Sequence, residues 1–482
     1  MIRMDHESRK RLGLTYVLGL LSPLTPYGAE RARSPRFYTP SEREALEREW
    51  DNVQAAMGVL TRDPNACERL KHLLMQVRDI RGTLRRCRDT VLTEVELFEV
   101  KRFLLQLALI APLFAAMGGS FRGIAFTEEA EALALLDPEG KRASGFAVGG
   151  PAAGALEAIR DEKRQVEMDL RKMPESKPRE ALLQARRRLA AQEEEENLKA
   201  RALLTEGLRP YAEALLQNAE MLGALDFALQ RAELARARGA CRPRAGDSLR
   251  FVEMEHPEVA DSLAGRGLAF MRISMEAPRG VTVVTGANMG GKSVALRALA
   301  LNALLCQAGF FAFAKEAVLP LFDAVEVAGD GFSEAGEGLS SFGWEVRRLQ
   351  GILEAITGVA FCLLVLDEPA RGTNPREGAA LARALVKRLA GMGAVTVMST
   401  HFDGIARDAQ AHYQAAGLTC MPKECAGEDQ LAFLARHMDY GLRRVDSEAE
   451  TPREALAICR LLGLDPEVME EMERGLGEIR EW

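Results

Sequence analysis

The sequence predicts an α/β domain with a mostly parallel sheet, preceded by an all-helical region that carries a helical hairpin. From about residue 247 onward, short apolar segments of strand length alternate with amphipathic segments of helix length, which is typical of parallel strands joined by crossover helices. One of these apolar segments leads into a glycine-rich loop and then into a helix start. Upstream, apolar residues recur at three- and four-residue spacing, as they do in helices.

Residues 1–125 are predicted to form a helical core domain. The helical spacing is clearest in "EREALEREWDNVQAAMGVL" and in "ACERLKHLLMQVRDI". Prolines at 23 and 26 and the stretch "RSPRFYTPSERE" separate the first helices, and Thr39 or Ser41 is a suitable helix cap. Residues 126–150 are predicted to be a small β-hairpin connector, because "DPEG" is a turn signal between two short apolar runs.

Residues 151–246 are predicted to be long helices that begin with an antiparallel hairpin. Leu156, Ile159, Val166 and Leu170 fall on one helical stripe, and "MPESKP" interrupts the pattern before a second arm. Basic and acidic residues are equally numerous in 151–200, so this stretch is highly charged but neutral. It can be a solvated strut or an arm that binds a partner, and the charge pattern alone leaves both open.

The α/β domain is predicted over residues 247–415. Its strands are expected within "GVTVVTGANMGGKS", "AFCLLVLDEPARG" and "AVTVMSTHFDG", and "REGAALARALVKRLAGMG" is expected to be an amphipathic helix between the last two. Residues 416–482 are predicted to be a helical tail, with two helices separated by a Gly463 stop and an Asp465-Pro466 start.

Composition narrows the class of protein. The chain has 482 residues, a formal net charge of −7 and 6% aromatic residues, so there is no global attraction to nucleic acid and few residues for base stacking. The eight scattered cysteines are typical of reduced thiols in the cytoplasm, and we expect no membrane association. Cys420 and Cys425, near His412 and His437, could fit a metal site, although two incidental thiols are the simpler interpretation.

The glycine-rich loop has the spacing of a phosphate-binding loop. Residues 286–293, "GANMGGKS", fit the pattern G-x-x-x-x-G-K-S in full, between a strand and a helix. The backbone N–H groups would enclose the phosphates of a nucleotide, Lys292 would reach the β- and γ-phosphates, and the Ser293 hydroxyl would bind Mg²⁺. The predicted ATP-binding residues are Gly286, Ala287, Asn288, Met289, Gly290, Gly291, Lys292, Ser293 and Val294.

An acidic pair follows the second strand. Asp367 would hold Mg²⁺ directly or through water, and Glu368 would orient and deprotonate the attacking water. His401 ends the next strand and could contact the γ-phosphate or that water. The predicted metal ligands are therefore Ser293 and Asp367, and the predicted catalytic residues are Glu368 and His401.

In order and spacing, "TGANMGGKS", "GLSSFGWEV", "LDEPARGTNPREG" and "STHF" resemble the ATPase domain of the MutS family. "GTNPREGAALA" is most similar to the second bacterial MutS branch. The resemblance implies ATP hydrolysis with Mg²⁺ at composite sites of a dimer, most simply a homodimer, with a heteromeric assembly also open. Ser340 and Ser341 would reach the other subunit's γ-phosphate, and residues 372–374 would communicate between the two sites. Residues 151–246 would be the family's lever helices with a shortened or absent clamp, and 416–482 would complete the dimer.

The sequence departs from mismatch-repair members of the family. We find no Phe-x-Glu wedge in the first 100 residues, expect no nuclease domain after the ATPase region, and see little room for a clamp at "MPESKP". This combination resembles the MutS-like ATPase subunit of a reactivase for the cobalamin-dependent lysine aminomutase. An aminomutase is therefore the favoured partner. The alternative is an ATPase of DNA repair or recombination that binds mismatched or branched DNA.

Overall fold

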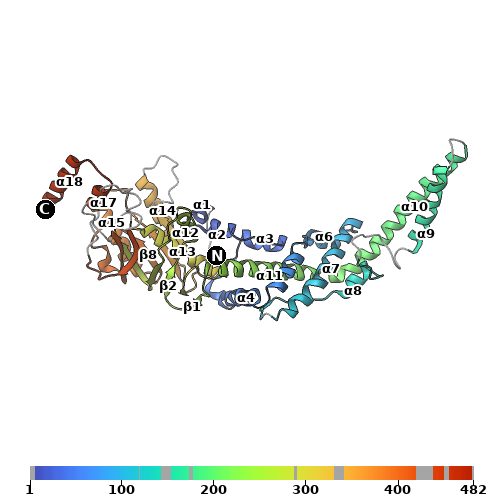
Figure 1. Cartoon of the computed structure of the whole chain (residues 1–482), viewed down its shortest axis with the longest axis horizontal. Coiled ribbons are helices and arrows are strands. Elements are labelled where there is room, and N and C mark those ends of the chain that lie inside the picture. Colours follow the sequence, from blue (N-terminus) through green and yellow to red (C-terminus); the bar gives the residue numbers. More distant parts are fainter. Residues whose placement is uncertain are drawn as a thin grey trace. The chain divides into compact units, whose positions relative to one another are not determined.

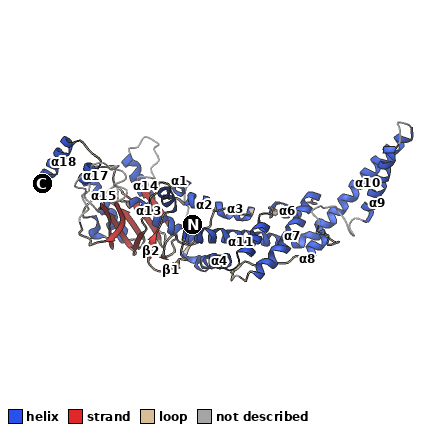
Figure 2. Cartoon of the chain, viewed as in Figure 1, coloured by secondary structure: helices blue, strands red, loops and turns tan. Residues whose placement is uncertain are grey.

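The computed structural model describes residues 6–118, 120–142, 154–172, 177–286, 290–329, 341–418, 438–449 and 455–479. The chain forms two compact units. The sheet unit contains residues 1–21, 35–54 and 231–482, and the helical unit contains residues 22–34 and 55–230. All strands of the described ranges belong to the sheet unit (Figure 2). Residues 1–21 and 35–54, which the sequence grouped with the helical core, therefore join the sheet unit.

The larger sheet of the sheet unit has six strands in the order β10-β9-β4-β8-β7-β6. Four of its pairings are parallel, and only β9 and β10 pair antiparallel. The three apolar segments identified in the sequence form β4, β8 and β7, which are neighbours in the sheet. The strands are β4 (Gly280–Thr285), β6 (Ala324–Gly329), β7 (Cys362–Asp367), β8 (Val395–Ser399), β9 (Ala411–Leu418) and β10 (Met438–Arg444).

The smaller sheet was not anticipated from the sequence. Its order is β1-β5-β2-β3, in which β1 and β5 pair parallel and the other pairs are antiparallel. Its strands are β1 (Arg244–Ala245), β2 (Leu249–Met254), β3 (Ile273–Ala277) and β5 (Glu316–Leu319). The fold is thus a helical N-terminal region followed by two mixed sheets. Four of the five pairings in the larger sheet are parallel, whereas the smaller sheet is mostly antiparallel.

One face of the larger sheet is covered by α14 (Ser341–Ile356) and α15 (Pro375–Ala390). Alternate residues of β7, Cys362, Leu364 and Leu366, join their apolar side chains in one core cluster, as the two-residue period of a strand requires. Helix α13 (Lys292–Gln307) lies outside that cluster, contacts β7 and β8, and is buried on nearly all sides. The buried strands and this helix fix the loops at the ends of β4, β7 and β8.

Long-range hydrogen bonds hold residues 35–54 against α13. The Gln307 side chain donates to the carbonyl oxygens of Tyr38 (2.7 Å) and Phe322 (2.9 Å) and accepts from the Phe322 N–H. The Trp50 indole N–H, on α4 (Arg43–Arg62), donates to Cys306 O at 3.1 Å. These groups are buried, so each bond avoids the cost of an unsatisfied polar atom.

His256 makes the sheet unit sensitive to acid. Its ring is buried beneath Gly13, and both ring nitrogens lack a hydrogen-bond partner among the described residues. Burial, and secondarily the Arg297 charge, lowers the pKa of His256 from 6.5 to about 4. The unfolded chain therefore binds a proton first as pH falls, and the stability due to neutral His256 is present above pH 6.5 and lost between pH 6.5 and 4.

We therefore expect the His256→Gln variant to lose less stability on acidification than the parent chain. Between pH 7 and pH 5 the difference should be about 2 kcal/mol, from the linkage between the two pKa values. Urea unfolding monitored at the two pH values measures it. An equal loss of unfolding free energy in parent and variant would show that another group controls the acid response.

The rest of the sheet unit consists of short helices and the tail. These are α1 (His6–Arg11), α2 (Leu14–Gly19), η1 (Pro40–Glu42), α12 (Pro257–Ala264), η4 (Ile405–Asp408), α17 (Ala455–Leu461) and α18 (Pro466–Ile479). The two predicted tail helices correspond to α17 and α18, but residues 416–482 are not all helical as predicted, because β10 and the end of β9 lie within them. Among the described residues, no helix has the length and apolar character needed to cross a membrane.

The helical unit shares α4 and α11 with the sheet unit, since the division of the chain falls inside both helices. Its helices are α3 (Pro26–Arg33), α5 (Pro64–Leu74), α6 (Arg81–Cys87), α7 (Glu94–Ala116), α8 (Ala130–Leu136), α9 (Gly154–Lys172), α10 (Lys177–Leu208), η3 (Arg209–Tyr211) and α11 (Ala212–Arg238).

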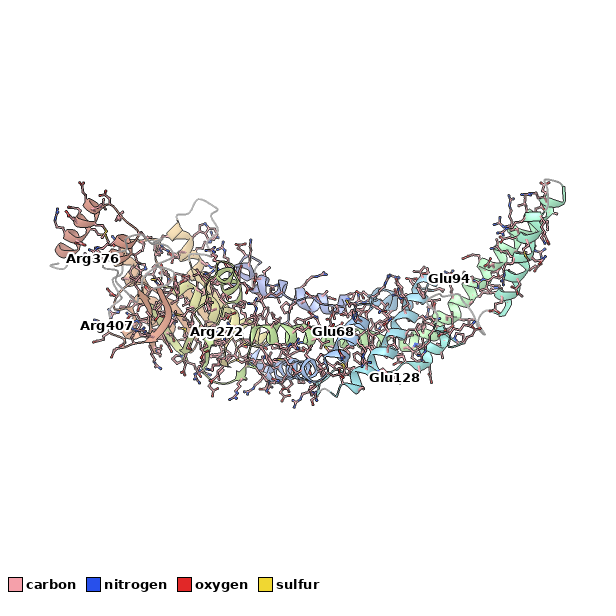
Figure 3. The ribbon with its side chains drawn as sticks, viewed as in Figure 1. Glu68, Glu94, Glu128, Arg272, Arg376 and Arg407 are labelled. Atoms are coloured by element: carbon pink, nitrogen blue, oxygen red, sulfur yellow. The ribbon has the colours of Figure 1, made fainter. Side chains whose placement is uncertain are left out.

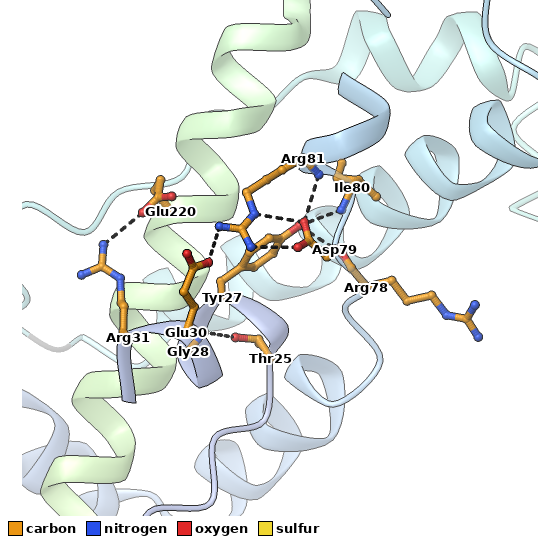
Figure 4. Close-up of polar contacts among 10 residues, drawn as sticks. All are labelled: Thr25, Tyr27, Gly28, Glu30, Arg31, Arg78, Asp79, Ile80, Arg81 and Glu220. Atoms are coloured by element: carbon orange, nitrogen blue, oxygen red, sulfur yellow. Dashed lines mark hydrogen bonds and ion pairs between the residues drawn. The ribbon is translucent and has the colours of Figure 1, made fainter. Parts of the chain in front are cut away.

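A polar network joins α3, α6 and α11 within the helical unit (Figure 4). The Tyr27 hydroxyl donates to Arg78 O at 3.1 Å and accepts from the Ile80 N–H at 3.2 Å. Arg81 pairs with Glu30 at 2.6 Å and with Asp79 at 2.8 Å. Burial raises the pKa of Tyr27 to about 12, so the hydroxyl keeps its proton and its donor role at neutral pH. The network fixes α3 to its neighbours.

Helices α9 and α10 lie side by side as the predicted antiparallel hairpin (Figure 1). Arg186 on α10 pairs with Glu167 on α9, while Glu193 farther along α10 pairs with Lys163 and Arg160 earlier on α9. As the residue number of the partner on α10 rises, that of its partner on α9 falls, so the two helices are antiparallel. Glu94, at the start of α7, is labelled in Figure 3. It pairs with Arg160 at 3.8 Å. The segment "MPES" between the helices lies outside the described residues.

The predicted β-hairpin over 126–150 is corrected where the structure describes it. Residues 130–136 form helix α8, because "AEALALL" consists of strong helix formers whose propensity outweighs the apolar pattern. The turn signal at residues 138–140 follows this helix and ends it. Residues 143–150 lie outside the described residues.

Candidate nucleotide site

The predicted phosphate loop starts at the end of β4. Gly286 has φ 139° and Gly291 has φ 77°, a region that favours glycine. A Cβ on Gly286 would lie 2.8 Å from the Ala415 Cβ, and one on Gly291 would lie 3.0 Å from the Tyr440 ring. Both positions therefore require glycine for backbone and space. Helix α13 begins immediately afterwards and directs its N-terminus toward the loop.

Lys292 is the first residue of α13 and is almost fully buried. Its ammonium group donates to Gly286 O at 2.7 Å and lies 3.0 Å from the Glu368 Oε1. The first bond spans the loop from one end to the other. The second joins the loop to the acidic pair that follows β7, so two motifs far apart in the sequence meet at one buried ion pair.

Glu368 is held in an uncommon backbone conformation. Its φ is 49° and that of Ala370 is 70°, both in the left-handed region that non-glycine residues rarely adopt. The Ala370 N–H donates to the carboxylate of Glu345 on α14, which fixes the turn. Strained backbone of this kind persists where the surroundings hold it, and it clusters at functional sites.

The second carboxylate oxygen of Glu368 faces two cationic or polar side chains. Arg371 Nη1 lies 3.6 Å from Oε2 and His401 Nδ1 lies 3.8 Å from it. The His401 ring lies against the Phe402 ring at an angle of 45°, and its Nδ1 has no hydrogen-bond partner among the described residues. The predicted catalytic residues Glu368 and His401 are therefore neighbours, although their separation exceeds a hydrogen bond.

Ser399 is a site residue that sequence reasoning missed. Its buried hydroxyl donates to Asp367 Oδ1 at 2.6 Å and accepts from the Glu368 N–H at 2.9 Å. One side chain thus fixes both members of the acidic pair. The sequence offers only its place at the start of "STHF", after an apolar segment, because its register beside Asp367 is set by the sheet.

The structure describes most of the predicted site residues, and several of them lie close together. It brings Gly286, Lys292, Asp367, Glu368 and His401 together around the ends of β4, β7 and β8. Gly290, Ser293 and Val294 are described beside them, in the loop and in α13. Ala287, Asn288, Met289 and Ser340 lie outside the described residues, and Ser341 is described only as the first residue of α14.

The loop after the acidic pair leads into α15. Gly372 lies against Phe342 of α14, where a Cβ would approach to 3.4 Å. Thr373 Oγ1 donates to Glu377 at 3.2 Å, and Asn374 caps α15 by accepting from the Arg376 N–H at 2.9 Å. These contacts connect the loop to both helices that cover one face of the sheet.

The donor set suits Mg²⁺. A hydroxyl from Ser293 and a carboxylate from Asp367 are the hard oxygen ligands that this cation prefers. The described residues hold no cluster of three or more His, Cys, Asp or Glu side chains that could bind a metal. His412 uses both ring nitrogens, one with Thr285 Oγ1 at 2.8 Å and one with Asp446 O at 2.7 Å. Cys420, Cys425 and His437 lie outside the described residues.

Comparison with known proteins identifies this region. The family model of MutS domain V matches residues 282–460. The chain is 38% identical over 230 residues to a DNA mismatch repair protein MutS from Thermus thermophilus, covering 48% of this chain and 27% of that protein.

The second bacterial branch also matches. The chain is 30% identical over 268 residues to an Endonuclease MutS2 from Thermus thermophilus, covering 55% of this chain and 33% of the relative. It is 34% identical over 225 residues to an Endonuclease MutS2 from Latilactobacillus sakei, covering 45% of this chain and 27% of that protein. The matched part thus spans a third or less of each of these relatives.

Proposed function

Because the chain belongs to the MutS family, we propose that it hydrolyses ATP with Mg²⁺ at the site formed by α13 and the ends of β4, β7 and β8. The observation that carries this proposal is the buried pair of Lys292 and Glu368, 3.0 Å apart, which joins the phosphate loop to the acidic pair. The experiment is direct: the purified full chain should release phosphate from ATP in the presence of Mg²⁺.

Binding of ATP would use the α13 N-terminus and Lys292. The helix dipole and loop N–H groups favour a phosphate at that end. A phosphate there offers Lys292 oxygen partners that compete with Gly286 O and Glu368. Ser293 and Asp367 would hold Mg²⁺, which would neutralise charge on the β- and γ-phosphates.

Hydrolysis would use Glu368 as the general base. Once Lys292 turns to phosphate, Glu368 Oε1 is released from its ion pair and can accept a proton from a water molecule. Arg371 and His401 stay near Oε2 and orient the carboxylate. Ser399 fixes the backbone of Glu368 and the carboxylate of Asp367 at the same time, so it acts as a positioning residue.

We expect the Ser399→Ala variant to lower ATP turnover by about 10- to 100-fold, because displacing a catalytic group by about 1 Å has an effect of this size. ATP binding should change by no more than about twofold. Ser399→Thr keeps a hydroxyl and should recover most of the turnover. Steady-state rates together with fluorescent-nucleotide titration separate the two quantities. Unchanged kcat in Ser399→Ala would contradict the positioning role.

We also propose that two chains complete each site. The support is the resemblance of "GLSSF" to the family segment that reaches the other subunit's γ-phosphate. Mixing Lys292→Ala chains with Ser340→Ala/Ser341→Ala chains should restore activity, since half of the sites in a mixed dimer would then be intact. If the mixture is as inactive as its components, the shared site is contradicted.

The partner on which the ATPase acts has two candidates. The neutral charge of 151–200 and the four residues that separate α9 from α10 favour a protein partner. The sequence resemblance favours an aminomutase, whose damaged cobalamin cofactor would be released. The names of the relatives, a mismatch repair protein and an endonuclease, favour DNA.

One comparison distinguishes these partners. ATP turnover is measured with mismatched duplex, with branched duplex and with an inactivated lysine aminomutase. Stimulation by DNA that weakens steeply with salt supports the DNA role. ATP-dependent recovery of aminomutase activity, with no response to DNA, supports the reactivase role.

A further inference from the structure

Helix α7 in the helical unit has two apolar faces, and only one is packed within the chain. Leu97, Val100, Leu104 and Leu107 are buried in the unit. A second stripe at heptad spacing comprises Val95, Phe98, Arg102, Leu105 and Leu109. Val95 is 67% exposed and Leu109 is 49% exposed. A helix that is apolar all round is normally buried all round, so this second face is missing a partner.

Four residues of this stripe, all except Val95, line a groove. The groove has a volume of about 570 Å³ and is formed by α7 together with one residue that follows α5 and one that follows α8. Its lining residues are Gln76, Phe98, Arg102, Leu105, Gln106, Ala108, Leu109 and Arg142. Heptad-spaced apolar side chains beside a groove are the arrangement into which a second amphipathic helix packs.

Two arginines give the groove a positive charge in a chain whose net charge is −7. Arg102 lies over the Phe98 ring at 5.9 Å. Neither Arg102 nor Arg142 has a carboxylate partner among the described residues, whereas many other arginines of this unit are paired. Their guanidinium groups are thus available to an acidic partner.

Arg142 is held in place by a buried ion pair. Lys101, the neighbour of Arg102, pairs with Asp137 at 3.0 Å, and both side chains are almost fully buried. The other oxygen of Asp137 accepts from the Arg142 N–H at 2.9 Å, where the backbone has a φ of 48°. The loop after α8 is therefore fixed to α7, and Arg142 is fixed at the groove.

One acceptor in the groove is unsatisfied. Gln106 donates through Nε2 to Gln76 at 3.0 Å, but its Oε1 is buried with no hydrogen-bond partner among the described residues. A buried acceptor without a partner destabilises the folded chain, because it has lost its hydrogen bond to water. A bound molecule that carries a donor would remove this destabilisation.

We propose that this groove binds an amphipathic helix of a partner protein, with apolar residues at heptad spacing and acidic residues beside them. Phe98, Leu105 and Leu109 receive the apolar face, and Arg102 and Arg142 pair with its carboxylates. A second copy of α7 does not fit this chemistry, because antiparallel packing centred on Arg102 would place two guanidinium groups against each other.

The test uses two synthetic helical peptides of 18 residues and the full chain. Both carry leucine at the first and fourth heptad positions; one has glutamate at the flanking positions and the other has lysine there. By fluorescence anisotropy, the glutamate peptide should bind to the parent chain at least tenfold more tightly than the lysine peptide does. Leu109→Asp should weaken it at least tenfold, and Arg102→Glu should reverse the preference toward the lysine peptide. Leu203→Asp, which alters a leucine exposed on α10, should change neither affinity.

Other outcomes overturn the proposal. Equal binding of both peptides, or a glutamate-peptide affinity unaffected by Arg102→Glu, excludes charge-specific docking. If the parent chain binds neither peptide but self-associates in sedimentation, and Leu109→Asp abolishes the self-association, the face binds a second copy of the chain. If the parent chain co-sediments with phosphatidylglycerol vesicles and Leu109→Asp does not, the face binds a membrane surface. Thermal unfolding of each variant confirms that the loss is not a loss of folding.

Discussion

The Glu368→Gln variant is expected to bind ATP as the parent chain does and to lose ATP turnover by at least about 100-fold, the lower range for removal of a general base. Glutamine has the same shape, so its amide oxygen can still accept from Lys292 at the position of Oε1, 3.0 Å away. The backbone N–H of residue 368 still donates to Ser399. What disappears is the carboxylate that accepts a proton from water.

Turnover and binding are measured separately for this variant, by phosphate release and by titration with a fluorescent ATP analogue. Glu354→Gln is the matched control, because Glu354 is an exposed residue of α14 away from the site. Its turnover should equal that of the parent chain. Parental turnover in Glu368→Gln would instead assign the proton transfer to another group.

The central part of the site could be predicted because local patterns determine it. Three short apolar segments alternate with helices and therefore form parallel strands of one sheet. Because the carboxyl ends of parallel strands lie at the same edge, the polar residues that follow each segment share that edge. Lys292, Asp367 and Glu368 come from two of these segments, and the structure joins them through the Lys292–Glu368 pair and the hydrogen bond from Ser399. Periodicity and loop spacing are sufficient for such an inference.

The remainder depends on tertiary contacts that have no local signal. The spacing of residues 43–54 predicts a helix in either unit. Residues 35–54 join the sheet unit because Gln307 and Trp50 make hydrogen bonds across more than 250 positions of sequence. Ser399 is an ordinary strand residue until β7 is placed in register beside it. The turn predicted at residues 138–140 is present, but it ends a helix and does not join two strands, because helix propensity decided the state of residues 130–136 before it.

The Lys292→Ala variant is expected to lose ATP binding by at least about 100-fold. Lys292 is the buried cation that would face the β- and γ-phosphates, and alanine offers no donor there. Isothermal titration with ATP and Mg²⁺ measures the loss. Lys315→Ala is the control, since Lys315 is an exposed lysine of the same unit that pairs with Glu253, and its ATP affinity should be unchanged.

Loss of binding in Lys292→Ala could also follow from loss of stability, because Glu368 is buried and would lose its nearest cation. Breaking a buried ion pair by removing one partner costs about 3–5 kcal/mol. The double variant Lys292→Ala/Glu368→Gln removes both charges and should recover much of the thermal stability in the absence of nucleotide. It should still not bind ATP, because the phosphate partner is missing in both variants. Recovery of ATP affinity together with stability would mean that Lys292 maintains the fold of the loop and does not bind phosphate.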